Sequence, residues 1–393
     1  MKETAILLNG PISNDSRVIK TIKSLMGKMN ITLFYLDGNP DKDHEIFKSN
    51  YVKLISFNRE NSLKIKILKH SFFCREFAYF KTKIIRTNIK YDYIWANDLP
   101  LLKVACKTAL KLNSKVIYDS HEIYIETINQ FFPSNSSFIK KTIFNSLIKI
   151  MRIHGKINEN KYIKKTHAFI TVNESILNLF NQKYSLPIHK KSIMNVPYLN
   201  ETNANNEKRD FRKIFNWNSD DKVILYQGFL NMGRGLDILI NSMSLLENKY
   251  KLVILGHGPI KNDLEKLCEN LDLNNQIKFM GVIANKDLIS YTKGADLGVN
   301  LLEELNLSKA MASPNKLFEY IHADIPVLCS KSIENNRFIN QFPLGKLIQN
   351  KPNEVAQGIK HVLNSSFEEA MFVKAKKEYS WEKQEDSILE IFD

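Results

Sequence analysis

The sequence predicts an α/β protein made of two doubly wound parallel-sheet domains that face each other across a cleft. Along the chain, apolar runs of strand length alternate with segments of helical periodicity. The apolar runs are continuous, which is typical of parallel strands covered by helices on both faces. Residues 200–210 are polar and lack periodicity, and they form the best linker in the chain. We therefore expect a first domain over residues 1–199 and a second over residues 208–379.

The apolar runs give the order of the expected strands. In the first half they cover residues 5–9, 30–36, 91–96, 115–119 and 167–172. In the second half they cover residues 222–227, 251–255, 276–280, 295–302 and 325–330. Helical segments lie between them. One of these begins near Ser313, the expected N-cap, with Pro314 at the first helical position.

The net charge of +14 is concentrated in two segments. Residues 62–90 and residues 139–166 each carry eight basic side chains and one acid, a net +7 apiece. A helix over residues 139–153 has apolar and basic faces, so it fits an anionic membrane surface and equally a solvated basic face. No nucleic-acid-binding pattern accompanies the charge, so we expect no nucleic-acid partner.

The remaining composition indicates an ordinary globular protein of the cytoplasm. The start of the chain has too short an apolar run for a signal peptide, and no run approaches the length of a membrane span. The four cysteines are scattered, without a C-x-x-C pair, which argues against disulfides and against a zinc site.

In open parallel sheets, ligands bind beyond the carboxyl ends of the strands. Titratable residues follow the expected strands of the first half, whereas glycines follow those of the second half. This asymmetry predicts chemistry on the first domain and close backbone approach to a ligand on the second. The residues at these positions are Gly10, Asp98, Asp119, His121 and Glu122, and then Gly228, Gly256 and Gly258.

A glycine-bearing turn joins a strand to a helix over residues 226–240. Gly228, Gly233 and Gly235 would let backbone amides approach an anion at the helix N-terminus. Arg234 would add a forked donor matched to phosphate oxygens. Tight turns with a surface arginine explain the stretch equally well, and it is neither a dinucleotide fingerprint nor a P-loop.

His121 lies just past a strand end, where an imidazole can donate, accept or shuttle a proton. Asp119 or Glu122 could fix its tautomer. A lone histidine is more often structural, but the position of His121 at the ligand edge favours a functional role.

Three acidic and basic residues near the N-terminus have structural alternatives. Asp15 fits the N-cap of a helix, which explains it without a function. Arg17 is less expected in a first turn, and an acidic ligand nearby would rationalise it. Asp41 and Asp43 could form a metal-binding pair, but their polar loop predicts solvated surface.

Taken together, these motifs resemble those of the retaining glycosyltransferases of family 4, which have the GT-B fold. The segment 313–330 is similar to the family's second Glu of a paired-Glu motif, and residues 227–240 to its diphosphate loop. Residues 118–123 resemble its N-domain histidine motif, and residues 14–20 its first loop and helix. Residues 380–393 resemble the C-terminal segment that crosses back onto the first domain.

The resemblance implies a sugar nucleotide, UDP- or GDP-linked, held by the second domain and an acceptor held by the first. Glu319 would accept from the ribose hydroxyls, and Arg234 would neutralise the leaving group. His121 would contact the transferred sugar. No metal or other cofactor is implied. The remaining donor-side residues are Gly228, Gly256, Gly258, Asn315, Lys316 and Leu317, and the acceptor-side residues are Gly10, Asp15, Arg17, Asp98 and Glu122.

Three positions depart from the family pattern. Met311 stands where many members have the first Glu, with Glu303 and Glu304 as replacements. Phe229 stands where an Arg is usual, which leaves Arg234 as the main clamp. Asp324 replaces a glycine at a helix end, and Asp is tolerated in a left-handed cap.

The expected function is glycosyl transfer to a lipid-linked or polysaccharide acceptor in cell-surface glycan synthesis, such as lipopolysaccharide or capsule. The protein would work on the cytoplasmic face of the membrane, docked through residues 62–90 and 139–166. The alternatives are a sugar-nucleotide epimerase of the same fold and a non-catalytic protein that binds nucleotide sugar or nucleic acid.

Overall fold

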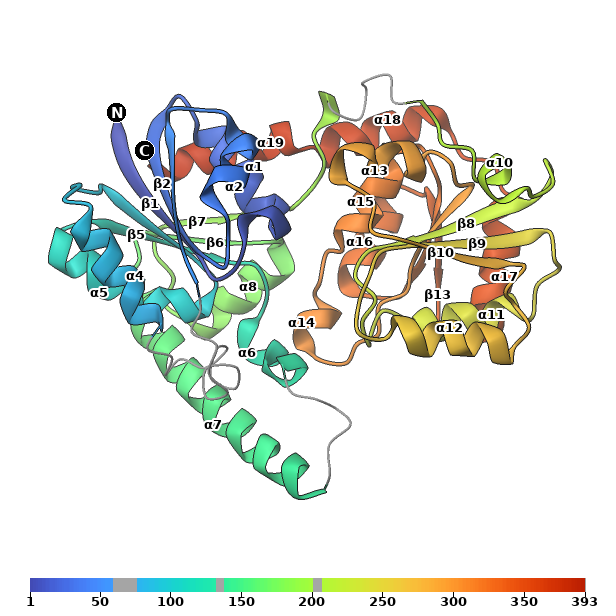
Figure 1. The fold of residues 1–393 in the computed structure, drawn as a ribbon, viewed down its shortest axis with the longest axis horizontal. Coiled ribbons are helices and arrows are strands. Elements are labelled where there is room, and N and C mark those ends of the chain that lie inside the picture. The colour runs from blue at the N-terminus through green and yellow to red at the C-terminus, as the bar shows by residue number, and fades with distance from the viewer. Residues whose placement is uncertain (59–75, 132–137, 201–206, 393) are drawn as a thin grey trace. The chain divides into compact units, whose positions relative to one another are not determined.

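The computed structural model describes residues 1–58, 76–131, 138–200 and 207–392, and it forms two compact units (Figure 1). The first unit contains Met1–Asn195 together with Gln384–Asp393, and the second contains Val196–Lys383. The chain thus divides between Asn195 and Val196, a few residues before the polar linker expected from the sequence.

The first unit has a seven-stranded parallel sheet of order β3-β2-β1-β4-β5-β6-β7. Its strands are β1 (Lys2–Leu8), β2 (Met29–Leu36), β3 (Val52–Phe57), β4 (Tyr93–Asn97), β5 (Lys115–Ser120), β6 (Ala168–Thr171) and β7 (His189–Ser192). Its helices are α1 (Ser16–Leu25), α2 (Pro40–Phe47), α4 (Glu76–Arg86), α5 (Leu99–Leu112), α6 (Tyr124–Thr127), α7 (Phe138–Ile163) and α8 (Glu174–Lys183), with 3₁₀ turns η1 (Ile12–Asn14) and η2 (Ile128–Phe131).

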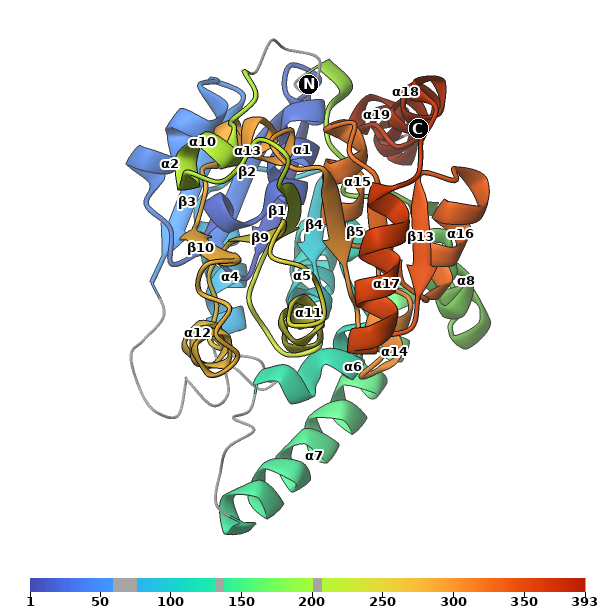
Figure 2. The same cartoon turned by 90° about the vertical axis from the view of Figure 1, so that its right-hand side faces the viewer.

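The second unit has a six-stranded parallel sheet of order β10-β9-β8-β11-β12-β13 (Figure 2). Its strands are β8 (Lys222–Gln227), β9 (Tyr250–Leu255), β10 (Ile277–Gly281), β11 (Leu297–Asn300), β12 (Val327–Ser330) and β13 (Gly345–Ile348). Its helices are α10 (Phe211–Phe215), α11 (Leu236–Met243), α12 (Lys261–Asn270), α13 (Asn285–Thr292), α14 (Leu307–Ala310), α15 (Asn315–His322), α16 (Ile333–Gln341), α17 (Pro352–Leu363) and α18 (Glu369–Glu378).

The prediction of two parallel-sheet α/β domains is confirmed. The central strands are buried along nearly their whole length, as in Tyr93–Asn97 and Val223–Gln227, because helices cover both faces. Three strands at sheet edges, β3, β7 and β13, were not among the expected strands. Their residues are only partly buried, so they do not form continuous apolar runs.

Each sheet has a point where the strand order reverses, between β1 and β4 and between β8 and β11. Loops leaving such neighbouring strands diverge and open a crevice at the carboxyl edge. This places the segments after β1 and β4 together in one unit, and the segments after β8 and β11 together in the other.

The C-terminal segment returns to the first unit through α19 (Trp381–Leu389) and the turn η3 (Glu390–Phe392). The Phe392 ring packs edge-on against Tyr93 at a centroid distance of 4.9 Å. The Phe392 carbonyl accepts a hydrogen bond from Lys2 Nζ at 2.8 Å. The last residues of the chain are therefore part of the first unit's core.

No helix in the described part of the chain is long and apolar enough to cross a membrane. Cys106, Cys268 and Cys329 are buried free thiols, and Cys74 lies outside the described residues.

Candidate functional site

Two glycine-bearing loops pack against each other beyond β8 and β9. A Cβ on Gly256 would lie 1.9 Å from the Gly228 carbonyl oxygen, and one on Gly258 would lie 2.0 Å from the Leu230 carbonyl oxygen. Gly228 and Gly256 also have φ angles of +130° and +134°, which side-chain-bearing residues rarely adopt. Loop packing therefore accounts for Gly256 and Gly258 without a ligand.

Gly228 has a second consequence for the site. A Cβ built on Gly228 would lie 3.6 Å from Nζ of Lys316, so the absence of a side chain leaves the lysine head beside the loop backbone. Lys316 comes from the first turn of α15, which brings this predicted donor-binding residue next to the loop after β8.

Lys316 is buried, with only 7% of its surface exposed, and its Nζ lies 3.6 Å from the centroid of the Tyr226 ring. Burial lowers its pKa well below the usual value, and the nearby Arg234 guanidinium lowers it further. Two predicted donor-binding cations therefore lie close enough to repel each other. A bound polyanion would relieve this repulsion and favour the charged lysine.

Arg234 precedes α11 in a turn held by Glu303. The Gly235 N–H donates to Glu303 Oε1 at 3.3 Å, and the Glu303 N–H donates to the Gly233 carbonyl at 3.1 Å. Glu303, expected as a replacement for a missing sugar contact, thus braces the loop that carries Arg234. Glu304 is exposed beside it, and Met311 is partly buried.

Helix α15 begins one residue later than expected. Its N-cap is Pro314, which makes no side-chain capping bond, and Ser313 Oγ donates instead to Glu334 Oε2 at 3.3 Å. The prediction of Ser313 as N-cap is therefore wrong. Since no side chain caps the helix, its first amides remain available to an anion.

Glu319 is oriented by residues that the sequence did not single out. Gln227, the last residue of β8, donates from Nε2 to Glu319 Oε2, and Thr292 Oγ1 donates to Gln227 Oε1 at 2.9 Å. The Gln227 backbone N–H donates to the Tyr320 hydroxyl at 3.1 Å. Glu319 is thus fixed at the strand end, and only the position of Gln227 at a strand terminus could have pointed to it.

The remaining predicted donor-side residues differ in exposure. Asn315 is exposed at the start of α15. Leu317 is 1% exposed and its N–H donates to the Pro314 carbonyl, so its side chain serves the core. Phe229, which stands where an Arg was expected, is 47% exposed and packs edge-on against His257.

In the first unit, Arg17 and Asp119 form a buried ion pair. Arg17 donates from Nη2 to Asp119 Oδ1 at 2.7 Å and from Nε to Oδ2 at 3.3 Å, and Nη1 donates to the Ile193 carbonyl. Burial opposes the charge of Asp119, but Arg17 and His121 hold the pKa of that carboxyl well below its usual value. Asp119 thus supplies the acidic group that we expected near Arg17, so no ligand is needed to explain the arginine.

His121 lies among three carboxylates. Its Nδ1 is 3.8 Å from Asp15 Oδ2 and 3.8 Å from Asp98 Oδ2, and its Nε2 is 3.6 Å from Asp119 Oδ2. Burial lowers the pKa of the imidazole, but Asp98 and Asp119 outweigh burial and raise that pKa to about 9. At neutral pH His121 is therefore a cation that can donate a hydrogen bond and cannot act as a base.

Asp98 shapes this cluster through both its backbone and its carboxylate. It has a φ angle of 65°, and its Oδ1 accepts from the His121 N–H at 3.0 Å. Burial raises the pKa of Asp98, and the His121 charge partly offsets this. The structure thus brings Asp15, Asp98 and His121 together from the segments after β1, β4 and β5.

Two predicted acceptor-side residues lie outside these contacts. The Glu122 carboxylate accepts from Thr127 Oγ1 at 2.8 Å, and it makes no printed ion pair with His121. No atom lies within 4 Å of a Cβ built on Gly10, so steric crowding does not require a glycine there.

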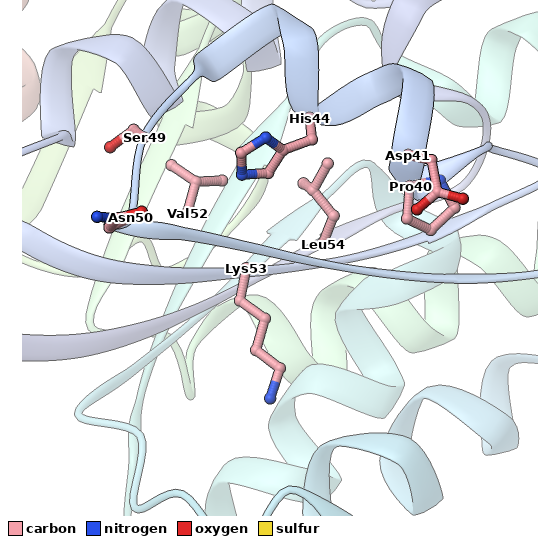
Figure 3. A pocket seen from close by; sticks show the side chains of 8 residues that line it. All are labelled: Pro40, Asp41, His44, Ser49, Asn50, Val52, Lys53 and Leu54. Atoms are coloured by element: carbon pink, nitrogen blue, oxygen red, sulfur yellow. The ribbon is translucent and has the colours of Figure 1, made fainter.

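The pair Asp41 and Asp43 is not the solvated pair expected from the sequence. Asp43 is buried, and it accepts from the Tyr35 hydroxyl at 2.7 Å and the Asn39 N–H at 2.9 Å. Asp41 borders a hollow of about 570 Å³ between α2 and β3, in which His44 and Leu54 point toward each other (Figure 3). None of the predicted site residues lines this hollow. Among the residues described, no group of three His, Cys, Asp or Glu side chains is placed to hold a metal.

Comparisons with known proteins connect the second unit to sugar transfer. Residues 207–379 match the model of a family described as glycosyl transferases group 1. An uncharacterised glycosyltransferase of Methanocaldococcus jannaschii is 29% identical over 186 residues, which cover 45% of this chain and 46% of that protein. A second uncharacterised glycosyltransferase of the same organism is 23% identical over 339 residues, covering 83% of this chain and 74% of that protein.

Among solved structures, the Anabaena protein HepE in complex with UDP and glucose superposes with a TM-score of 0.70 at 14% identity. The match covers 100% of this chain and 99% of that chain. Together with the two parallel sheets, this likeness identifies the fold as GT-B.

Proposed function

We propose that this chain is a retaining glycosyltransferase that moves a sugar from a nucleoside-diphosphate sugar to an acceptor. One observation carries the proposal. A buried lysine, an arginine and a fixed carboxylate gather at the uncapped start of α15, beyond the carboxyl end of β8. The family match over residues 207–379 supports the same reading of the second unit.

In this proposal the diphosphate lies against Arg234, Lys316 and the first amides of α15. Glu319, held by Gln227, accepts hydrogen bonds from the ribose hydroxyls. Positive charge around the diphosphate stabilises the negative charge that grows on the departing group, which is where electrostatic stabilisation lowers the barrier most. Gly228 leaves space for the lysine head beside the same loop.

In the reaction, the bond between the anomeric carbon and the phosphate oxygen breaks, and a bond to the acceptor oxygen forms on the same face. The acceptor's proton passes to the departing phosphate oxygen, so no external base is required. This agrees with a protonated His121, which would donate a hydrogen bond to the transferred sugar. Asp98 and Asp119 keep His121 charged.

We further propose that the acceptor is lipid-linked or a growing polysaccharide, and that the enzyme works in cell-surface glycan synthesis at the cytoplasmic face of a membrane. The basic segment within α7 supports this placement. Much of the other basic segment, residues 62–90, lies outside the described residues.

The test is incubation with a panel of UDP- and GDP-sugars, with and without a lipid-linked acceptor. Nucleotide release that rises with acceptor supports transfer. Isomerised sugar nucleotide, or release that ignores the acceptor, would identify the epimerase alternative. Binding without turnover in every condition would identify a non-catalytic protein.

The donor site has its own test in Glu319→Ala. Loss of a hydrogen-bonding carboxylate should weaken nucleotide-sugar binding by about 1–3 kcal/mol in calorimetry. The matched control is Glu269→Ala, at an exposed position of α12. Equal affinities of the two variants would remove Glu319 from the donor site.

A further inference from the structure

Helix α7 exposes four isoleucines on one face. Ile143, Ile150, Ile153 and Ile157 are 53%, 54%, 52% and 58% exposed. Their spacings of seven, three and four residues place them along a single stripe of an α-helix. We call these four residues the isoleucine face. Scattered exposed apolar residues are common, but an aligned row on the outside of one helix marks an interaction surface.

The opposite face of α7 already has its partners. Met151, Tyr162 and Ile163 are buried, and α7 packs against α5 and α6 within the first unit. In both views the first turns of α7 extend away from the sheet of that unit (Figures 1 and 2). The isoleucine face is therefore not a part of the core.

The charges beside the isoleucine face are all positive. Lys149 and Lys156 are exposed and lie one turn before and one turn after Ile153, on either side along the helix. The only acid of α7 is Glu159, which is buried and accepts from the Tyr118 and Tyr184 hydroxyls. Arg152, in contrast, points toward Glu126 at 3.6 Å and away from this surface.

We propose that the isoleucine face inserts into the surface of an anionic lipid bilayer, with Lys149 and Lys156 at the lipid phosphates. An apolar row flanked by lysines matches the boundary between acyl chains and charged headgroups. A second copy of this chain fits less well, because pairing two such helices would bring like charges together. The inference goes beyond the proposed reaction and does not depend on which sugar is transferred.

The test uses the full chain and vesicles of phosphatidylcholine with or without phosphatidylglycerol. Wild type should float with the anionic vesicles, bind neutral ones weakly, and dissociate as salt rises. Ile150→Ser/Ile153→Ser should bind anionic vesicles at least roughly tenfold more weakly, because two inserted side chains lose their apolar contact. Lys149→Gln/Lys156→Gln should bind more weakly and lose most of the salt dependence.

The matched control is Leu110→Ser/Ile188→Ser, which changes two residues of the first unit that are 87% and 93% exposed and lie off α7. This variant should bind vesicles as wild type does. Equal binding by the isoleucine-face variant and the control would overturn the proposal, as would no binding of wild type to anionic vesicles.

Light scattering of the same proteins tests the competing occupant. A wild-type dimer that the isoleucine-face variant alone disrupts would assign the surface to a second copy and overturn the lipid proposal. Calorimetry with UDP separates this proposal from the proposed reaction. Failure to bind UDP with intact vesicle binding would sink the enzyme proposal and leave the membrane surface standing.

Discussion

The charge of His121 depends on residues from three different loops. Asp15, Asp98 and Asp119 all lie within 4 Å of its ring nitrogens, and they raise its pKa to about 9. This cluster therefore stabilises the fold in a pH-dependent way, and the direction of that dependence can be worked out.

A group whose pKa is higher in the folded state binds its proton more tightly there. The stability from His121 is therefore fully present below pH 6.5, its usual pKa, and is lost as the pH rises through about 9. We expect the free energy of unfolding of wild type to fall more steeply over this window than that of His121→Gln. Urea unfolding at a series of pH values measures both slopes.

The control for this experiment is His44→Gln, at an exposed position of α2. Its slope should match that of wild type. A His121→Gln slope identical to wild type would mean that the carboxylates do not hold the imidazole charged.

Lys316 makes a second prediction at this scale. Burial and Arg234 lower its pKa well below the usual value, and a bound diphosphate should restore its charge. Wild type should therefore take up protons when it binds UDP, as calorimetry in two buffers of different ionisation enthalpy can show. Lys316→Met should lose this uptake and bind UDP about 1.5–3 kcal/mol more weakly, as expected for a lost charged hydrogen bond.

The folded state of Lys316→Met should be no less stable than wild type, since an apolar side chain then fills a buried position. Lys331→Met, at an exposed position after β12, serves as control. Undiminished UDP affinity in Lys316→Met would show that the lysine head does not face the nucleotide.

At the scale of single elements, helix α15 ends with a residue in the left-handed conformation. Asp324 has a φ angle of 60°, and its Oδ1 accepts from Lys376 Nζ at 2.7 Å. The sequence allowed this cap, because Asp tolerates the conformation better than most residues. The ion pair with Lys376, from a helix fifty residues further along the chain, was not visible in the sequence.

Two substitutions separate the backbone term from the ion pair. Asp324→Ala and Asp324→Gly both remove the carboxylate, but only Gly adopts positive φ without cost. We expect Asp324→Ala to be about 1 kcal/mol less stable than Asp324→Gly in urea unfolding. Equal stabilities would show that the helix end rearranges to a different cap.

The elements that sequence patterns predicted are those whose burial is uniform. Strands in the middle of both sheets read as continuous apolar runs, whereas the edge strands β3, β7 and β13 mix exposed and buried positions. The start of α15 was misplaced for a different reason. Ser313 matches the local capping preference, but Glu334, from a later helix, takes its hydroxyl.

The site was predictable where strand ends carry unusual residues, and not where its contacts are long-range. Position alone marked His121 and Glu319. The buried pair of Arg17 with Asp119 joins residues 102 positions apart, and the support of Glu319 by Gln227 joins residues 92 apart. Patterns of local spacing carry no information about such pairs.

At the scale of the whole molecule, the C-terminal segment completes the first unit. Phe392 is 6% exposed and packs against Tyr93 and Trp95. Phe392→Ala should destabilise the first unit by about 3–5 kcal/mol, the usual cost of removing a buried aromatic ring. Because the two units can unfold separately, hydrogen exchange in β1 and β4 is the appropriate measurement.

The matched control is Leu110→Ala, at a position of the first unit that is 87% exposed. It should leave exchange in β1 and β4 unchanged. Exchange rates in Phe392→Ala equal to those of the control would mean that the final turn of the chain is dispensable for this core.

The return of the chain also sets an order in which the protein can be made. The second unit is one continuous stretch, Val196–Lys383, whereas the first needs residues that lie at both ends of the sequence. A ribosome releases the chain from its N-terminus at about 5–20 residues per second, and domains generally fold as units. The first sheet is therefore synthesised early but must wait for Phe392, while the second unit can fold ahead of it. A chain that stops short of its last ten residues would leave the older half unfinished and the younger half intact.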